Sequence, residues 1–204
     1  MSSEMTAAHG GHADAHHGPA KGVMRWITTT NHKDIGTMYL VFSLLMLFVG
    51  GAMAMVIRSE LAEPGLQVVN PAFFNEMMTL HGLIMIFGVL MPALVGFANW
   101  MVPMQIGAPD MALPRLNNWS FWLLVAGMSM LLSTLIMPGG APAMGWTMYA
   151  PQVEQTPYAF PFMIFAVHLM GISSILGSIN IISTILNLRA PDMKLLKMPL
   201  FVWT

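Results

Sequence analysis

Four long stretches of the chain contain no Asp, Glu, Lys or Arg. They cover about residues 35–57, 77–102, 119–137 and 158–187, and charged residues or turns rich in Pro and Gly separate them. A helix needs about 20 residues to cross the hydrocarbon of a bilayer. The pattern therefore predicts an all-α, polytopic membrane protein with four transmembrane helices.

The composition agrees with this fold class. Of 204 residues, 56% are hydrophobic and 8% are charged, whereas about 25% of the residues of a soluble domain are charged. An ordinary soluble protein is therefore excluded. The chain has no Cys, which excludes a disulfide framework and a thiolate metal site.

The basic residues are sorted by position around these stretches. Seven of the eight lie in segments expected on one side of the membrane: Lys21, Arg25, Lys33, Arg115, Arg189, Lys194 and Lys197. Only Arg58 is expected on the other side. Because basic residues concentrate in cytoplasmic loops, we expect the N-terminus in the cytoplasm or on the equivalent side of an organelle, and four spans return the chain to that side.

Residues 1–24 are polar and are expected to form a mobile tail, followed by one membrane domain over 25–204. No cleavable signal peptide is expected, because a long polar segment precedes the first apolar stretch. The tail contains four histidines: His9, His12, His16 and His17. They form either a metal-binding tract or, as the composition favours, part of a solvated tail.

His81 lies in the apolar run MMTLHGLIMIF, about one turn inside the expected start of its helix. An ionisable side chain in hydrocarbon needs a partner or a purpose. Two interpretations are equally supported: an axial ligand to a buried haem iron, or an imidazole bonded to a neighbouring helix. His168, in the fourth stretch, is interpreted as a packing residue, with a partner or proton-relay role as the alternatives.

Asp110 lies in a short loop between the second and third stretches, with Asn99, Asn117 and Ser120 near the adjoining helix ends. A carboxylate at a membrane mouth, followed inward by side chains that hold water, is typical of a proton entrance. The alternative is a solvated loop acid with capping asparagines. The pattern alone favours the alternative.

Several longer motifs occur in a fixed order along the chain. They are TTNHKDIGTMYL at 29–40, IRSELAEPG at 57–65, TLHGLIMIFGVLMP at 79–92, GFANWMVPMQIGAPDMALPRLNNWSFWLL at 96–124, GWTMYAP at 145–151, HLMGISSILGSINIISTI at 168–185 and PLFVWT at 199–204. Together they resemble the N-terminal part of subunit 1 of cytochrome c oxidase, in the haem–copper oxidase superfamily. Ala150 and Met170 depart from the pattern, which commonly has Pro and a hydroxyl residue there.

The resemblance implies a role for five residues near the outer face. His81 matches an axial ligand of low-spin haem A, whose second ligand lies in a later helix. Arg58 matches a hydrogen-bond donor to the haem formyl group, and Trp146 a residue near the propionates. Glu60 and Gly65 match a calcium or sodium site, for which oxygen ligands are suited.

The resemblance also implies a D-type proton channel that begins at Asp110. Its water chain would run along Asn99, Asn117, Asn180, Ser120, Tyr39, Ser173 and Ser174.

Members of the resembled family have about twelve transmembrane helices, and this chain stops where the fifth is expected to begin. The residues that hold the high-spin haem and copper are expected beyond Thr204, so the fragment alone is not expected to be active. The expected whole is the catalytic subunit of a terminal respiratory oxidase that transfers electrons from cytochrome c to oxygen and pumps protons. Its expected partners are subunits 2 and 3, cytochrome c and the lipid of a bacterial inner (plasma) membrane, with no nucleic acid.

Three alternatives remain at this stage. A quinol oxidase of the same superfamily would share His81 and Asp110. A four-helix cytochrome b would need His81 and His168 as its two haem ligands, and their expected depths differ. A non-redox four-helix membrane protein would need no cofactor.

Overall fold

The computed structural model describes residues 22–155 and 158–204. Four helical spans are long and apolar enough to cross a membrane, which confirms the predicted fold class. They are α2 (His32–Glu60), α3 (Pro71–Leu83) continued by the π-helix η1 (Ile84–Leu90) and α4 (Met91–Ile106), α5 (Pro114–Ser133) extended by η2 (Thr134–Ile136), and α6 (Ala159–Asn187). The chain is a multi-pass membrane protein, and its described residues contain no strand.

The first three spans begin several residues before the charge-free stretches do. Side-chain caps begin the first two, and Pro114 occupies the first turn of the third. Asn31 accepts hydrogen bonds from the amides of Lys33 and Asp34 at the start of α2. Asn70 accepts one from Phe73 at the start of α3, and Pro71 occupies the first turn of that helix. These are the residue types that begin helices, and hydropathy alone does not detect them.

A short helix that the pattern did not predict, α1 (Val23–Thr28), precedes α2. Arg25 forms an ion pair with Asp34 at 3.1 Å, and the Asn118 amide donates to the carbonyls of Ile27 and Thr29 at 3.1 and 3.0 Å. Helix α1 is therefore attached to α2 and α5. The expected mobile tail, residues 1–24, overlaps α1 only at residues 23 and 24. The four tail histidines lie outside the described residues.

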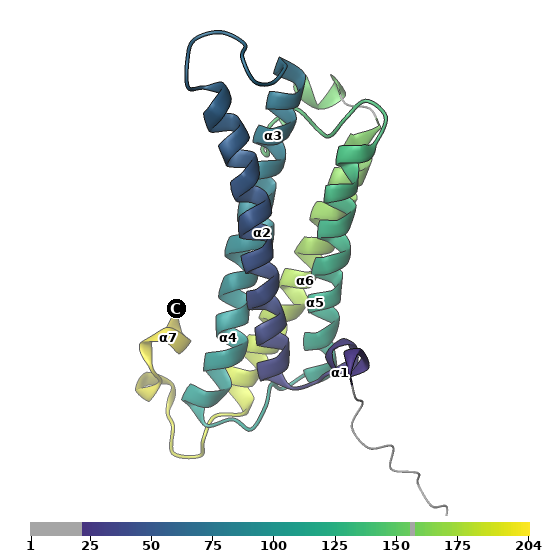
Figure 1. The fold of residues 1–204 in the computed structure, drawn as a ribbon. Helices are drawn as coiled ribbons and strands as arrows, with labels where there is room; N and C mark the ends of the chain where they lie inside the picture. Colours follow the sequence, from purple (N-terminus) through teal and green to yellow (C-terminus); the bar gives the residue numbers. More distant parts are fainter. Residues whose placement is uncertain (1–21, 156–157) are drawn as a thin grey trace, which may run out of the picture.

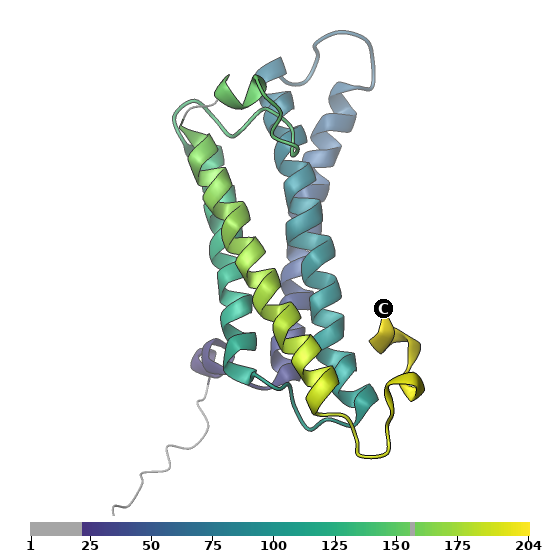
Figure 2. The same ribbon diagram turned by 180° about the vertical axis from the view of Figure 1, so that it is seen from behind.

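The spans form two antiparallel pairs, α2 with α3–α4 and α5 with α6 (Figures 1 and 2). We call the end of the bundle where α2 begins the lower end, as drawn in Figure 1, and the opposite end the upper end. The lower end carries α1, the 107–113 loop, and the C-terminal pieces η4 (Leu195–Lys197) and α7 (Leu200–Trp203). The upper end carries the 61–70 loop, a connection through η3 (Gln152–Gln155), and the start of α6.

Glycines let the helices of each pair approach closely. A methyl group built on Gly36 of α2 would lie 3.0 Å from the Gly96 carbonyl oxygen of α4, and one on Gly127 of α5 would lie 2.9 Å from the Ala166 oxygen of α6. Small residues are the usual means of close helix packing in membranes, where burial from water does not drive association.

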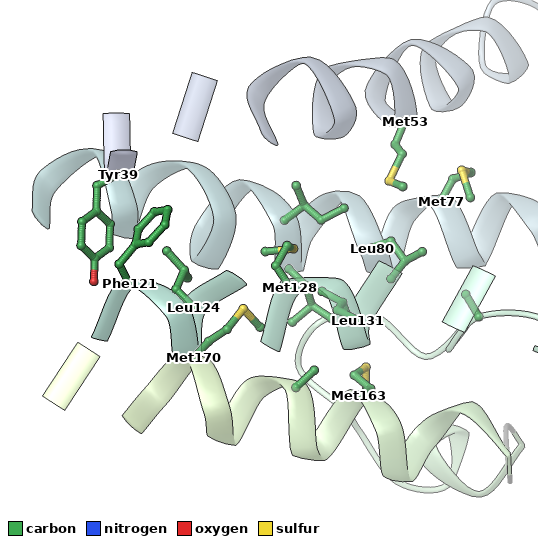
Figure 3. Close-up of a cluster of buried hydrophobic side chains, with 14 of the residues drawn as sticks. Tyr39, Met53, Met77, Leu80, Phe121, Leu124, Met128, Leu131, Met163 and Met170 are labelled. Atoms are coloured by element: carbon green, nitrogen blue, oxygen red, sulfur yellow. The ribbon is translucent and has the colours of Figure 1, made fainter. Parts of the chain in front are cut away.

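The space between the pairs is filled mainly by Leu and Met side chains from all four spans (Figure 3). Met170 is fully buried and lies against Gly127, where its Cγ would be 2.8 Å from an added methyl group. The flexible thioether fills an irregular gap. Met170, which departs from the pattern of the resembled family, therefore packs in the core.

The second span is not a uniform α-helix. Its π-helical segment begins at Ile84, three residues after His81, and ends just before Pro92. Proline has no amide hydrogen to donate to the preceding turn, and a wide π-turn is a common way for a helix to absorb such an interruption, frequently beside a functional residue.

Candidate functional site

His81 is half-buried on α3, and its ring faces α2. Its Nδ1 lies 2.9 Å from the Gly50 carbonyl oxygen. A carbonyl only accepts, so Nδ1 carries the proton and the neutral ring keeps its lone pair on Nε2. This is the tautomer that metal-binding histidines adopt, with the second nitrogen oriented by a backbone carbonyl. The side chain therefore fits an axial ligand, although its Nδ1 contact is also the helix-to-helix bond of the alternative.

Gly82 and Trp146 lie beside the candidate ligand. A methyl group on Gly82 would be 3.3 Å from both Cβ and Cδ1 of Trp146, so this aromatic side chain covers the glycine. Trp146 belongs to the upper connection and is half-exposed. The structure thus brings the loop tryptophan to the helix that carries His81.

Arg58 lies in the last turn of α2, eight residues beyond Gly50, which corresponds to about 12 Å along the helix. Its guanidinium is exposed and donates to the Leu61 carbonyl at 3.4 Å. Within the described residues the one ion pair is that of Arg25 with Asp34. Arg58 therefore forms no internal ion pair there and has donors free for another acceptor.

Glu60 organises the 61–70 loop. Its Oε1 accepts from the Gln67 amide at 3.1 Å, and its Oε2 accepts from Val68 and Val69 at 2.7 and 2.9 Å. The residue is buried beside a cleft of about 580 Å³ that Gly65 also lines. Three bonds leave part of the acceptor capacity of the carboxylate free. Among the described residues no three His, Cys, Asp or Glu side chains gather, so a cation here would also need carbonyl or water ligands.

The polar residues of the lower end form a buried cluster between the helix pairs. The Asn117 amide nitrogen donates to the Asn99 side-chain oxygen at 2.5 Å, and Asn99 donates to the Val95 carbonyl. Both asparagines are fully buried. They join α4 to α5 within the apolar bundle, so they are more than the solvated caps of the alternative interpretation.

Tyr39, Ser120 and Ser173 continue the cluster upward from Asn117. The hydroxyls of Tyr39 and Ser120 are 2.7 Å apart, Ser120 donates to the Asn117 carbonyl at 2.9 Å, and Ser173 donates to the Ser120 carbonyl at 2.6 Å. The Tyr39 ring packs edge-on against Phe121. Ser174 is half-buried and its hydroxyl makes none of these contacts.

Asp110 is half-buried in the 107–113 loop, and its carboxylate accepts from the Met111 amide at 2.7 Å. It forms no direct hydrogen bond with Asn99 or Asn117. Asn180, from α6, binds the same loop by accepting from the Leu113 amide at 2.8 Å. The structure therefore places Asp110 and the asparagines at one end of the bundle, without direct contact between them.

Two amide atoms of this cluster are buried without a protein partner, Oδ1 of Asn117 and Nδ2 of Asn180. An unpaired buried polar group is costly, and ordered water commonly satisfies such groups. An acceptor on α5 and a donor on α6 are thus both available to water molecules between the helices.

Sequence reasoning passed over two residues of the lower cluster. His32 is buried, and its Nδ1 lies 2.8 Å from the Asn99 carbonyl. Thr184 is fully buried and accepts from the Ala112 amide at 2.9 Å. His32 lies in the polar sequence before the first apolar stretch, so hydropathy did not indicate that it is buried. The position of Thr184, one helical turn after Asn180, was the available signal.

His81 lies ten residues after Pro71, the first residue of α3, and His168 lies nine residues after the first residue of α6. Helix α3 begins higher in the bundle than α6 does (Figures 1 and 2), so His81 remains nearer the upper end than His168, as expected. The two side chains also differ in direction. His168 is on the exposed face of α6 with its Nδ1 bonded to the Ile164 carbonyl of its own helix, whereas His81 faces α2.

Comparison with known proteins identifies the family. The sequence model described as "Cytochrome C and Quinol oxidase polypeptide I" matches residues 34–204. The chain belongs to this family. The matched range includes both the His81 segment and the Asp110 loop. The family agrees with the resemblance found in the motifs.

Curated members of the oxidase family are similar over nearly the whole chain. "Cytochrome c oxidase subunit 1" of Corynebacterium diphtheriae is 44% identical over 191 residues, which cover 91% of this chain and 34% of the relative. "Probable cytochrome c oxidase subunit 1-alpha" of Streptomyces coelicolor is 44% identical over 188 residues, which cover 91% and 32% respectively. The chain spans about a third of the length of these relatives.

Proposed function

We propose that this chain is the N-terminal part of the catalytic subunit of a terminal respiratory oxidase. The whole subunit would transfer electrons from cytochrome c to oxygen and pump protons, in complex with subunits 2 and 3. The bond from His81 to Gly50, which leaves Nε2 free, is the observation that carries the redox part of the proposal. The relatives are bacterial proteins, which supports a bacterial inner membrane. The basic residues support an orientation with the N-terminus, and thus the lower end, in the cytoplasm.

His81 is the proposed axial ligand of low-spin haem A. When bound, the haem supplies an iron that accepts and releases one electron. The Gly50 carbonyl orients the imidazole and increases its basicity. Trp146 covers Gly82 beside the ligand, and Arg58 is free to donate to the formyl group. The second axial ligand, the high-spin haem and copper would be held by the remainder of the subunit.

Asp110 is the proposed entrance for protons from the cytoplasm. The water chain is proposed to run along six buried residues, Asn99, Asn117, Asn180, Ser120, Tyr39 and Ser173, and the half-buried Ser174. The unpaired atoms of Asn117 and Asn180 are sites for water. Moving one charge against 100 mV requires about 2.3 kcal/mol. Proton uptake from one side during oxygen reduction would store energy in this form.

At the upper end, Glu60 and Gly65 are proposed to bind calcium or sodium. Glu63 and Asn75 also line the cleft beside them, and both residues bear oxygen atoms of the kind that hard cations prefer. The three amides bound to Glu60 would hold its carboxylate in place for the cation.

The test uses the complete oxidase purified with its full-length subunit. His81→Ala is expected to remove the low-spin haem signal from the reduced-minus-oxidised spectrum. Asp110→Asn is expected to preserve that signal and to slow turnover and proton uptake. A normal low-spin spectrum in His81→Ala would refute the ligand role, and unchanged proton uptake in Asp110→Asn would refute the entrance role.

The electron donor separates the proposal from a quinol oxidase. The family description names both donors, whereas the curated relatives are named as cytochrome c oxidases. Rapid oxidation of reduced cytochrome c by the purified enzyme is expected. Oxidation of quinol alone would select the alternative.

A further inference from the structure

The 107–113 loop is held by side chains at three consecutive backbone amides. Met111 donates to Asp110 at 2.7 Å, Ala112 to the Thr184 hydroxyl at 2.9 Å, and Leu113 to the Asn180 oxygen at 2.8 Å. Helix α5 begins at the next residue. Each amide in this run therefore has a specific acceptor, and two of the three acceptors come from α6.

The hydroxyl of Thr184 is oriented for this contact. It donates its hydrogen to the Asn180 carbonyl at 2.7 Å, which leaves its lone pairs for the Ala112 amide. The Met111 sulfur, 3.7 Å away, is a weaker acceptor for the same hydrogen. Asn180 and Thr184 are four residues apart on α6 and so share one face of the helix. They act as a pair on adjacent amides of the loop.

The beginning of the loop is also fixed. Helix α4 ends at Ile106 and is capped by Gly107, whose φ of 72° is left-handed. The Ala108 amide donates to the Pro103 carbonyl at 2.8 Å. Ala190, just after α6, donates to the Ile106 carbonyl at 2.9 Å. Asp110 therefore lies in a short segment with backbone attachments on both sides, and α6 or the residues after it provide attachments at each end.

We propose that Thr184 is a positioning residue for the Asp110 carboxylate. Its hydroxyl accepts from the Ala112 amide and thereby fixes the turn that contains Asp110. The position of the Asp110 carboxylate relative to the buried asparagines is fixed with it. Thr184 acts through the backbone and does not itself carry the proton. This inference rests on the proposed role of Asp110 as the proton entrance.

The test is Thr184→Val in the complete oxidase, because valine keeps the shape of threonine and removes the hydroxyl. The Ala112 amide then loses its acceptor, and we expect turnover at saturating donor and proton uptake to slow by about tenfold, the rate equivalent of one buried hydrogen bond. The KM for the electron donor and the low-spin haem spectrum are expected to be unchanged. Thr184→Ser keeps the hydroxyl and is expected to restore uptake.

The matched control is Thr134→Val at the upper end. Thr134 is also fully buried, but its hydroxyl donates only to the Leu131 carbonyl of the preceding turn. Its replacement is expected to leave proton uptake unchanged. If Thr134→Val slows uptake as much as Thr184→Val does, a general effect of buried hydroxyl loss replaces the positioning role.

Asp110→Asn, measured in parallel, separates this inference from the proposed function. Slow uptake in Asp110→Asn with normal uptake in Thr184→Val overturns the positioning role and leaves the entrance role standing. Normal uptake in Asp110→Asn overturns the entrance role itself. If Thr184→Val does not assemble, hydrogen exchange on the unsubstituted enzyme decides: protected amides at Ala112 and Leu113 support the inference, and rapid exchange at both overturns it.

Discussion

Gly50→Ala is the substitution that most directly tests how α2 supports His81. A methyl group at this position would lie 2.9 Å from the Met85 sulfur and 3.2 Å from Cγ2 of Ile84. The Met85 side chain can rotate away, but Ile84 is fully buried in the π-helical segment. We therefore expect α2 to move outward by a few tenths of an ångström, at an overpacking cost of about 1–3 kcal/mol.

This movement carries the Gly50 carbonyl away from His81. The distance from His81 Nδ1 to the Gly50 oxygen, now 2.9 Å, would increase toward about 3.2 Å, the longest distance typical of a good N–H···O bond. A weaker bond makes the imidazole less basic, and loss of such support typically lowers metal affinity by about 10–100-fold. If the affinity is lost for the oxidised iron only, each tenfold loss of affinity raises the one-electron midpoint potential of the haem by about 59 mV.

The assay is a redox titration of the low-spin haem in the complete oxidase, together with the temperature of inactivation. Gly51→Ala is the matched control, because a methyl group on the adjacent glycine meets no atom of the described chain within 4 Å. We expect a raised potential and lower thermal stability for Gly50→Ala alone. An unchanged potential in Gly50→Ala, or equal shifts in both variants, would refute the reasoning.

Two further predictions concern packing and the upper loop. Gly127→Ala places a methyl group 2.8 Å from Met170 Cγ and 2.9 Å from the Ala166 oxygen, so it should destabilise the α5–α6 pair by about 1–3 kcal/mol. The control is Gly171→Ala, which meets nothing within 4 Å, and equal inactivation temperatures would contradict the prediction. Glu60→Ala removes the acceptor of three loop amides and should speed proteolysis of the 61–70 loop, whereas cleavage at the parent rate would show that Glu60 does not order it. If a cation binds there, chelation should have the same effect on the parent protein and none on the variant.

The number and approximate places of the spans were predictable because each needs one long uncharged stretch, a property of the local sequence. Their ends were less predictable. Hydropathy treats Asn70 and Pro71 as loop residues, although these residues begin α3 six positions before the expected start at residue 77. The expected position of His81, about one turn inside its helix, therefore differs from the observed one, ten residues after the helix begins.

The candidate ligand illustrates what sequence could not provide. The motif around His81 predicted this residue as a haem ligand, but the ring nitrogen that carries its proton is set by the Gly50 carbonyl, a backbone atom 31 residues away. The proposed role of Thr184 was hidden for a related reason. A hydroxyl in a membrane helix normally bonds to its own preceding turn, and Thr184 does so, but only the fold shows that it also accepts from the 107–113 loop.

The π-helical segment Ile84–Leu90 has a consequence for insertions and deletions. It separates the upper part of the second span, which carries His81, from the lower part, which carries Asn99. Each residue of an α-helix turns the chain by about 100°. A wide π-turn uses more residues per turn than an α-helical turn does. Deleting one residue here, so that the turn becomes α-helical, would therefore keep His81 and Asn99 near their present angle. Deleting one residue from the α-helical part of the span between them would instead rotate Asn99 by about 100° relative to His81. The π-helical segment thus marks the place where the span tolerates a change of one residue without turning the face of His81 relative to that of Asn99.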